Sequence, residues 1–197
     1  TTITLSGSTS VAPLAAKLAS KYVKKNKGVQ FKLLQGGSDV GIADVSRGRV
    51  TLGMSSRDPK SSDPGGLVFN KIARDAICIV TNPDNPLSNI SQAQVQAVFG
   101  GSVRDWGAVS GSKLNSTIDV FVRTAASGTQ DAFQKIFLGS TKVFSGASQK
   151  SSNGLVQQAV SSNRSAIAYI DFKFTAGTAV APYQGIPCNL RNAKSGQ

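Results

Sequence analysis

Short apolar segments alternate along the chain with longer segments whose apolar residues recur every three or four positions. The short segments predict strands at 3–5, 29–34, 50–54, 75–81, 118–122 and 166–170. The periodic segments predict helices at 13–25, 40–46, 91–99, 131–137 and 154–160. Repeated strand–loop–helix units favour an α/β fold with largely parallel sheets.

The first predicted helix has an apolar and a basic face. Pro13 suits its first turn. Leu14, Leu18 and Tyr22 recur four residues apart and predict one apolar stripe. Four lysines fall mostly off this stripe, namely Lys17, Lys21, Lys24 and Lys25. Because runs of like charge on a helix are usually solvated, we interpret the lysines as a solvent-facing surface.

The chain is strongly basic. Its 197 residues include 22 Lys and Arg against 10 Asp and Glu, a formal net charge of +12. Such a surface attracts anions, so the alternative function is a basic nucleic-acid-binding protein that contacts phosphate groups nonspecifically. The sequence has no RNA-binding aromatic signature, zinc finger or basic region with heptads. We therefore expect no nucleic-acid partner.

Histidine is absent from the sequence. Its absence excludes Ser-His-Asp and Cys-His nucleophilic machinery and every zinc site that needs imidazole. An enzyme acting on phosphate esters would need a metal cluster or a general base, and the sequence shows neither clearly. We expect no catalytic residues, no metal, no cofactor and no enzymatic activity.

The two cysteines, Cys78 and Cys188, are too few for a Cys₄ site and allow one disulfide at most. Cys78 lies in an apolar strand and is interpreted as a buried small hydrophobe. The alternative, in an exported protein, is a disulfide between Cys78 and Cys188. No apolar run reaches the roughly 18 residues of a membrane span. The start, TTITLSGS, is not a signal peptide, so an exported protein would have its signal segment outside this chain.

Three strand-to-helix turns share one chemistry, and they occupy residues 7–10, 36–39 and 126–129. Each turn is small, carries hydroxyl groups and precedes a predicted helix. The first amides of a helix lack internal partners and bear partial positive charge, so they form a ready anion site. One such turn is ordinarily a helix cap, but three similar turns, with Arg123 four residues before Ser127, indicate anion binding. None of them has the sequence of a P-loop or of a dinucleotide-binding loop.

Five segments, in order along nearly the whole chain, resemble the substrate-binding proteins of the Pst-type phosphate ABC importers. They are GSTSVAPLAAKLASKY, LQGGSDVGIADVSRGRVTLGMSSRD, AICIVTNPDNPLSNISQAQVQAVFGGSVRDWGAV, VFVRTAASGTQDAFQKIFL and NGLVQQAVSSNRSAIAYIDF. The resemblance implies a two-lobed fold of the type II periplasmic binding proteins, with the ligand in the cleft between lobes. The first lobe is expected at 1–77 plus 168–197 and the second at 78–167.

The resemblance also implies the function and its residues. We expect an extracytoplasmic protein, a monomer, that captures inorganic phosphate for ABC permease subunits in the membrane. The phosphate-binding residues from the first lobe would be Thr9, Ser10 and Ser38. Those from the second would be Arg123, Ser127, Gly128 and Thr129.

The sequence departs from the family at the aspartate that accepts the proton of hydrogenphosphate in longer members. Ungapped alignment places Ser56 there, so Ser56 is predicted to be a ligand. Asp39 and Asp58 are the candidate proton acceptors, although Asp39 also fits a helix-start acid and Asp58 a turn residue before proline.

Three other residues have structural interpretations. Arg57 and Lys60 are interpreted as surface charges, and Trp106 as a residue of core or lobe packing.

Overall fold

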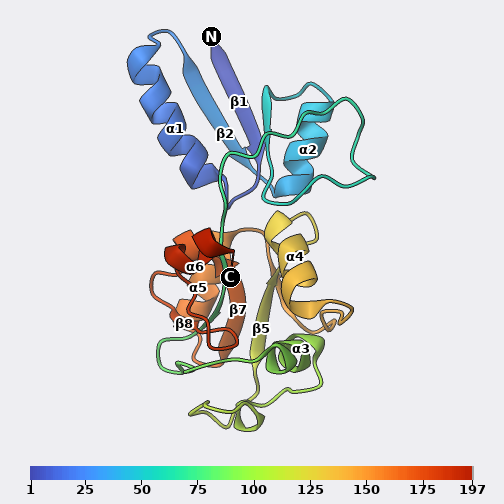
Figure 1. Cartoon of the computed structure of the whole chain (residues 1–197), viewed down its shortest axis with the longest axis vertical. Helices are drawn as coiled ribbons and strands as arrows, with labels where there is room; N and C mark the ends of the chain where they lie inside the picture. Colours follow the sequence, from blue (N-terminus) through green and yellow to red (C-terminus); the bar gives the residue numbers. More distant parts are fainter. Residues whose placement is uncertain (197) are drawn as a thin grey trace. The chain divides into compact units, whose positions relative to one another are not determined.

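The computed structural model describes residues 1–196. They form two compact units (Figure 1). The first unit comprises residues 1–72 and 125–131, and the second comprises residues 73–124 and the described residues from 132 onward.

The first unit is built on a three-stranded parallel sheet with the order β2-β1-β3. The strands are β1 (Thr2–Gly7), β2 (Gln30–Gln35) and β3 (Leu52–Met54), with α1 (Ala12–Lys25) and α2 (Ser38–Ser46) between them in the chain. Leu5 of β1 packs with Ala12 and Ala15 of α1, whereas the neighbouring Ser6 donates to Asp44 of α2 at 2.7 Å. Because successive strand residues point to opposite faces, α1 and α2 cover opposite faces of this sheet.

The buried stripe of α1 is not the one that the sequence predicts. Small residues face the sheet, with Ala12 and Ala15 buried, while Leu18 and Tyr22 are each 49 % exposed. The apolar stripe predicted at Leu14, Leu18 and Tyr22 is therefore not the buried face of the helix. Alanine at the contact brings the helix close to a narrow sheet, and the larger side chains are left at its flank.

The second unit contains a five-stranded mixed sheet with the order β6-β5-β7-β4-β8. The strands are β4 (Ile77–Thr81), β5 (Asp119–Arg123), β6 (Ser148–Lys150), β7 (Ala166–Asp171) and β8 (Ala179–Ala181). β5 runs parallel to β6 and β7, whereas β4 runs antiparallel to β7 and β8. The expectation of largely parallel sheets therefore holds for the first unit and only for part of the second.

The remaining helices follow the predicted segments closely. They are α3 (Gln92–Gly100), α4 (Gly128–Phe133), continued by a π-helical turn at Gln134–Leu138, and α5 (Asn153–Ser162). A further helix, α6 (Leu190–Ser195), and two 3₁₀ turns, Trp106–Ala108 and Phe172–Phe174, were not predicted. The short strands β6 and β8 were also missed.

The core of the second unit lies on both faces of its sheet. Ile79 and Tyr169 contribute to one cluster, and Cys78 and Ile170 contribute to the other. Trp106 is fully buried in the first of these clusters, and its indole Nε1 donates to Ser165 O at 2.9 Å. The packing role predicted for Trp106 is confirmed.

The two cysteines are joined. Cys78 of β4 forms a disulfide with Cys188, 110 residues later, with their Cα atoms 5.6 Å apart. Cys78 is fully buried, as predicted, but it is a half-cystine rather than an unpaired thiol. The bond ties the segment before α6 to a central strand.

The division into units differs from the expected lobes. Residues 168–196 belong to the second unit, because β7 lies between β5 and β4 in its sheet and all six of its residues are buried. The segment 125–131 instead belongs to the first unit. Strand pairing decides the first assignment, and contacts of residues 126–129 with Ser10 and Asp39 accompany the second. The spacing of motifs along the chain reveals neither.

Candidate anion-binding site

The turn between β1 and α1 carries three consecutive hydroxyl residues, of which Ser8 and Thr9 are buried. The Ser8 hydroxyl accepts hydrogen bonds from the amides of Ser10 at 3.2 Å and Val11 at 3.3 Å. The same hydroxyl donates to Ser56 Oγ at 2.9 Å. Ser8 therefore organises the start of α1 and connects it to the loop after β3.

The start of α2 lies beside that loop. Ser38 is fully buried at the first position of α2, and its Oγ accepts from the amide of Ser56 at 3.0 Å. The two hydroxyl oxygens are 3.3 Å apart. The first and second turns and the loop after β3 thus bring three hydroxyl groups together.

The third turn packs against the first two within the same unit. Thr129 Oγ1 lies 2.9 Å from Ser10 Oγ, and the amide of Asp39 donates to Ala126 O at 3.1 Å. Glycine is required at both contacts. Gly37 has a φ of +96° and a Cβ there would lie 2.7 Å from Ala126 O, while a Cβ on Gly128 would collide with the Ser38 and Ser56 hydroxyls.

Ser127 begins α4. It is buried, and its Oγ accepts from the amide of Gln130 at 3.2 Å, as in a helix cap. A hydroxyl that accepts one bond retains its own proton for donation, so this capping contact leaves the predicted ligand role of Ser127 intact.

Arg57 is the buried cation of this unit. Its side chain is 4 % exposed, which contradicts its interpretation as a surface charge. Nε donates to Asp39 Oδ1 at 2.8 Å, and Nη2 and Nη1 donate to the two carboxylate oxygens of Asp63 at 2.6 and 3.0 Å. The hydrogen bonds to the two carboxylates raise the pKa of Arg57 despite its burial. The bonds from Arg57 and from the Lys60 amide lower the pKa of Asp63 to about 2. Arg57 therefore fixes the loop that carries Ser56.

A second ion pair ties the same loop to α4. Lys60 Nζ lies 2.6 Å from Asp131 Oδ1, and the Lys60 side chain is 36 % exposed. Lys60 is thus partly exposed and paired, so its interpretation as a surface charge holds only in part.

The two candidate proton acceptors differ in their surroundings. The carboxylate of Asp39 is 44 % exposed and pairs with Arg57. Asp58 is exposed, and its backbone carbonyl accepts from Arg57 Nη1 at 2.9 Å. The structure brings Asp39 to the start of α2 next to Ser38 and places Asp58 at the surface of the loop.

Arg123 ends β5 in the second unit and is 3 % exposed. Its Nε donates to Lys150 O at 3.2 Å and its Nη2 donates to Ser151 O at 3.0 Å, while its backbone amide donates to Tyr169 Oη at 2.7 Å. Burial lowers the pKa of Arg123, and the nearby Tyr169 and Asp171 oppose this shift. Nη1 is buried without a hydrogen-bond partner. Because buried polar groups are normally paired, this donor is suited to an anionic ligand.

Hydroxyl groups and helix amides can bind a tetrahedral oxyanion. Among residues 1–196 there is no group of three or more acidic or cysteine side chains that could hold a metal ion. Over the same residues, no helix has both the length and the apolar character needed to cross a bilayer.

A family model described as a PBP superfamily domain matches residues 1–185. The chain belongs to the PBP superfamily. This membership and the α/β architecture confirm the type II periplasmic-binding-protein fold that the resemblance implies.

Two solved structures are similar to this PBP superfamily chain over nearly its whole length. One, from Clostridium perfringens, is described as a phosphate ABC transporter substrate-binding protein with bound phosphate. It has 28 % identity and a TM-score of 0.93, over 99 % of this chain and 81 % of its own. The other is an ABC-type phosphate transport receptor from Vibrio cholerae, with 26 % identity and a TM-score of 0.76, over 100 % of this chain and 82 % of its own.

Curated relatives of this PBP superfamily chain carry matching names. "Phosphate-binding protein PstS" of Bacillus subtilis is 26 % identical over 200 residues, covering 99 % of this chain and 66 % of the relative. "Phosphate-binding protein PstS 2" of Streptococcus pneumoniae is 37 % identical over 103 residues, covering 52 % and 35 %. The chain therefore spans less than two thirds of the length of these relatives. The Pst-type resemblance seen in the sequence is confirmed.

The sequence reasoning missed Ser8 and the role of Arg57. Ser8 lies in the predicted turn Gly7–Ser10. Its hydroxyl contacts that of Ser56 because β1 pairs with β3, and this pairing could not be predicted from the sequence. Arg57 gave no local signal, because its partners Asp39 and Asp63 are 18 and 6 residues away.

Proposed function

We propose that this protein captures inorganic phosphate and delivers it to an ABC importer. The observation that carries the proposal is the convergence of three strand-to-helix turns. The first turn contacts the third through Ser10 and Thr129, and it reaches the second through Ser56, whose hydroxyl lies near those of Ser8 and Ser38. The resemblance to proteins named for phosphate binding supports the same ligand.

Hydroxyl and amide donors supply most of the proposed binding chemistry. Thr9, Ser10, Ser38 and Ser56 supply hydroxyl groups, and the N-termini of α1 and α2 lie beside them. Their partial positive charge favours an anion. The proposed donors from the third turn are Ser127, Gly128 and Thr129.

We propose Arg123 as the cationic ligand. An arginine fork binds two oxygens of a tetrahedral anion at once, and a buried Nη1 without a protein partner supports this role. The pairing of its other nitrogens with backbone carbonyls would hold the guanidinium in a fixed orientation.

Selectivity for phosphate over sulfate requires an acceptor, because hydrogenphosphate donates a hydrogen bond and sulfate cannot. An acceptor that meets sulfate would face like charge and remain unpaired. We propose Asp39 for this role in preference to Asp58, since Asp39 adjoins the buried Ser38 at the start of α2. Asp39→Asn should relax the rejection of sulfate, and Asp58→Asn should change it little.

The proposed setting is extracytoplasmic. The protein would act as a monomer that exchanges phosphate with permease subunits in the membrane, and it would catalyse no reaction.

Calorimetric titration with phosphate, sulfate and arsenate tests the proposal. We expect saturable one-to-one phosphate binding that added salt weakens only modestly, whereas a nucleic-acid binder would lose affinity steeply with salt. Arg123→Ala should weaken phosphate binding by about 2–5 kcal/mol, the scale for removing one member of a buried charged contact. The matched control is Arg47→Ala, which removes an exposed arginine. A loss at Arg123 below about 0.5 kcal/mol would remove it from the ligand set.

A further inference from the structure

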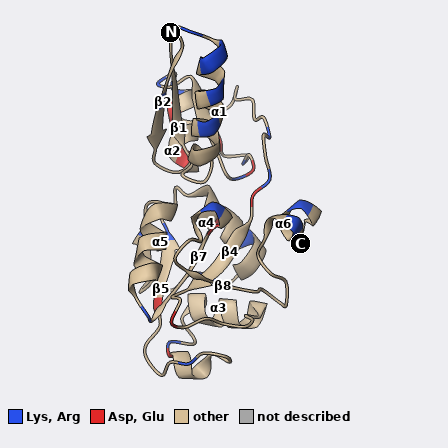
Figure 2. Cartoon of the chain, turned by 90° about the vertical axis from the view of Figure 1, so that its left-hand side faces the viewer, with Lys and Arg blue, Asp and Glu red and all other residues tan. Residues whose placement is uncertain are grey.

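The outer surface of α1 carries an uncompensated basic patch. Its four lysines, Lys17, Lys21, Lys24 and Lys25, are all exposed. They recur at steps of four, three and one residues, so they share one side of the helix. Figure 2 shows the basic residues along α1. The chain has no Asp or Glu before Asp39, so no acidic side chain of this N-terminal segment offsets these charges.

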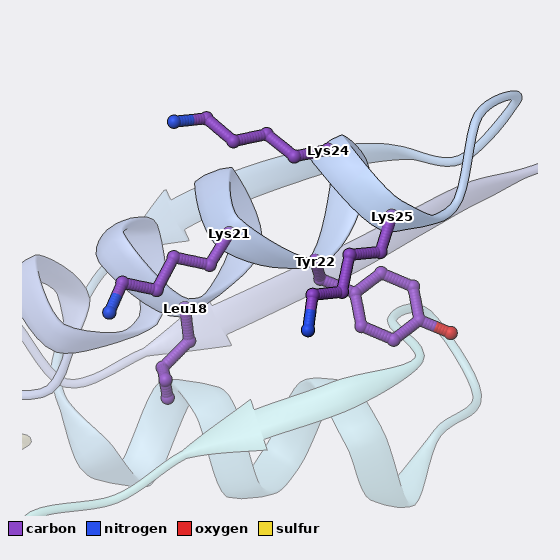
Figure 3. A pocket seen from close by; sticks show the side chains of 5 residues that line it. All are labelled: Leu18, Lys21, Tyr22, Lys24 and Lys25. Carbon is purple, nitrogen blue, oxygen red and sulfur yellow. The ribbon is translucent and has the colours of Figure 1, made fainter.

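Apolar surface borders the lysines. Leu18 and Tyr22, each 49 % exposed, line an open hollow of about 590 Å³ together with Lys21, Lys24 and Lys25. Figure 3 shows Lys21 and Lys25 extending to the same side as Leu18 and Tyr22, with Lys24 directed away from them. We call these five residues the α1 surface. It combines cationic groups with an aliphatic and an aromatic side chain.

We propose that the α1 surface docks on an anionic lipid bilayer. Lys21 and Lys25 would contact headgroup phosphates, and Leu18 and Tyr22 would enter the interfacial layer. Amphipathic basic helices bind membranes by this combination of charge and partly buried apolar side chains, and tyrosine favours the boundary between apolar and wet surroundings.

The composition of the patch favours a lipid surface over other anionic partners. Every cationic residue of the first 46 is lysine, and Arg47 is the first arginine. Interfaces with proteins are enriched in arginine and depleted of lysine at their centres, and specific contacts with nucleic acids also favour the arginine fork. A second copy of the chain would set lysine against lysine. A layer of mobile phosphate headgroups needs only point charges and exposed apolar side chains.

The α1 surface is separate from the proposed phosphate ligands. None of its five residues belongs to the three hydroxyl-bearing turns, so membrane docking and phosphate capture can be tested independently. Each lysine close to an anionic membrane contributes about fivefold in affinity. Loss of two lysines is therefore expected to weaken docking by about 25-fold, and reversal of their charge by more.

The test is sedimentation of the whole chain with vesicles of phosphatidylcholine, with and without phosphatidylglycerol. We expect binding only to the vesicles that contain phosphatidylglycerol, with affinity falling as salt screens the charges. Lys21→Glu/Lys25→Glu should abolish it. The matched control is Lys113→Glu/Lys142→Glu, which makes the same charge change at two exposed lysines of the second unit and should retain most of the binding.

A second variant isolates the apolar contribution. Leu18→Ser/Tyr22→Ser should weaken binding to phosphatidylglycerol vesicles at a salt concentration where the wild type still binds. Phosphate titration and circular dichroism of both α1 variants should match the wild type, which separates this proposal from the proposed function.

Three outcomes would overturn membrane docking by α1. The two charge-reversal pairs could weaken binding equally, which would mean that net charge alone acts. The α1 variants could bind the vesicles as well as the wild type. The chain could ignore the vesicles yet bind polyglutamate or duplex DNA through Lys21 and Lys25, which would assign the surface to an acidic protein or a nucleic acid.

Discussion

Replacement of Arg57 by methionine tests how the loop after β3 is held. The change keeps most of the aliphatic length and removes the guanidinium that bonds Asp39 and Asp63. The Arg57 side chain is 4 % exposed, and those of Asp63 and Asp39 are 9 % and 44 % exposed. The ion pair with Asp63 is therefore largely shielded from solvent, whereas the ion pair with Asp39 is partly exposed to solvent.

The loss of stability expected for Arg57→Met follows from the exposure of these side chains. Removing one member of a buried ion pair usually costs about 3–5 kcal/mol, because the other charge is left unpaired. Here Asp39 regains water, and Asp63 keeps a hydrogen bond from the Lys60 amide at 2.8 Å. We therefore expect Arg57→Met to lower the free energy of unfolding by about 2–3 kcal/mol, below the range for fully buried pairs.

Urea denaturation followed by circular dichroism measures this loss. Arg49→Met is the matched control, since Arg49 is 62 % exposed and lies 3.7 Å from Asp44. It should cost less than about 0.5 kcal/mol. Arg57→Met/Asp63→Asn should recover part of the stability by removing the unpaired charge. If Arg57→Met costs no more than Arg49→Met, the ion-pair argument is refuted.

The same pair makes a pH prediction. Arg57 holds the pKa of Asp63 at about 2, below its ordinary 3.8. A depressed carboxyl pKa stabilises the fold above the unfolded value, and the contribution disappears as the pH falls through the folded value. The difference in stability between wild type and Arg57→Met should therefore be full above pH 4 and shrink as the pH falls toward 2.

Three further predictions concern the disulfide, a carboxyl pair and a site glycine. Cys78→Ser/Cys188→Ser should lower the urea stability by up to about 4 kcal/mol, because the bond closes a long loop in the unfolded chain; an unchanged midpoint would contradict this. Although Asp75 is exposed as a residue, desolvation of its carboxyl and a hydrogen bond to the carboxyl of Asp171 raise its pKa. The folded state then binds the proton more tightly, so stability should fall as the pH rises from 4 to 8, and Asp75→Asn should flatten that profile of urea midpoints. Gly128→Ala puts a methyl group 2.6 Å from Ser56 Oγ, so urea denaturation should show the free energy of unfolding lowered by about 1–3 kcal/mol, the usual cost of overpacking.

The sequence by itself determined the local elements and the chemistry of the turns. The period of apolar residues is a local property, and it located β1, α1 and β2 to within about two residues, the usual uncertainty at element ends. The hydroxyl-rich turns were equally visible, because a helix start needs small polar residues within a few positions of each other. The buried state of Trp106 also followed from its type and surroundings.

Only the tertiary structure decided which face of each element is buried and which segments it contacts. The exposure of Leu18 and Tyr22 depends on how narrow a sheet α1 covers, and the direction of β4 depends on its pairing with β7. The partners of Arg57 and the bond from Cys78 to Cys188 likewise join positions that are distant along the chain. Period and propensity act over one or two helical turns, whereas burial, strand order and ion pairing depend on contacts between segments, which no local pattern encodes.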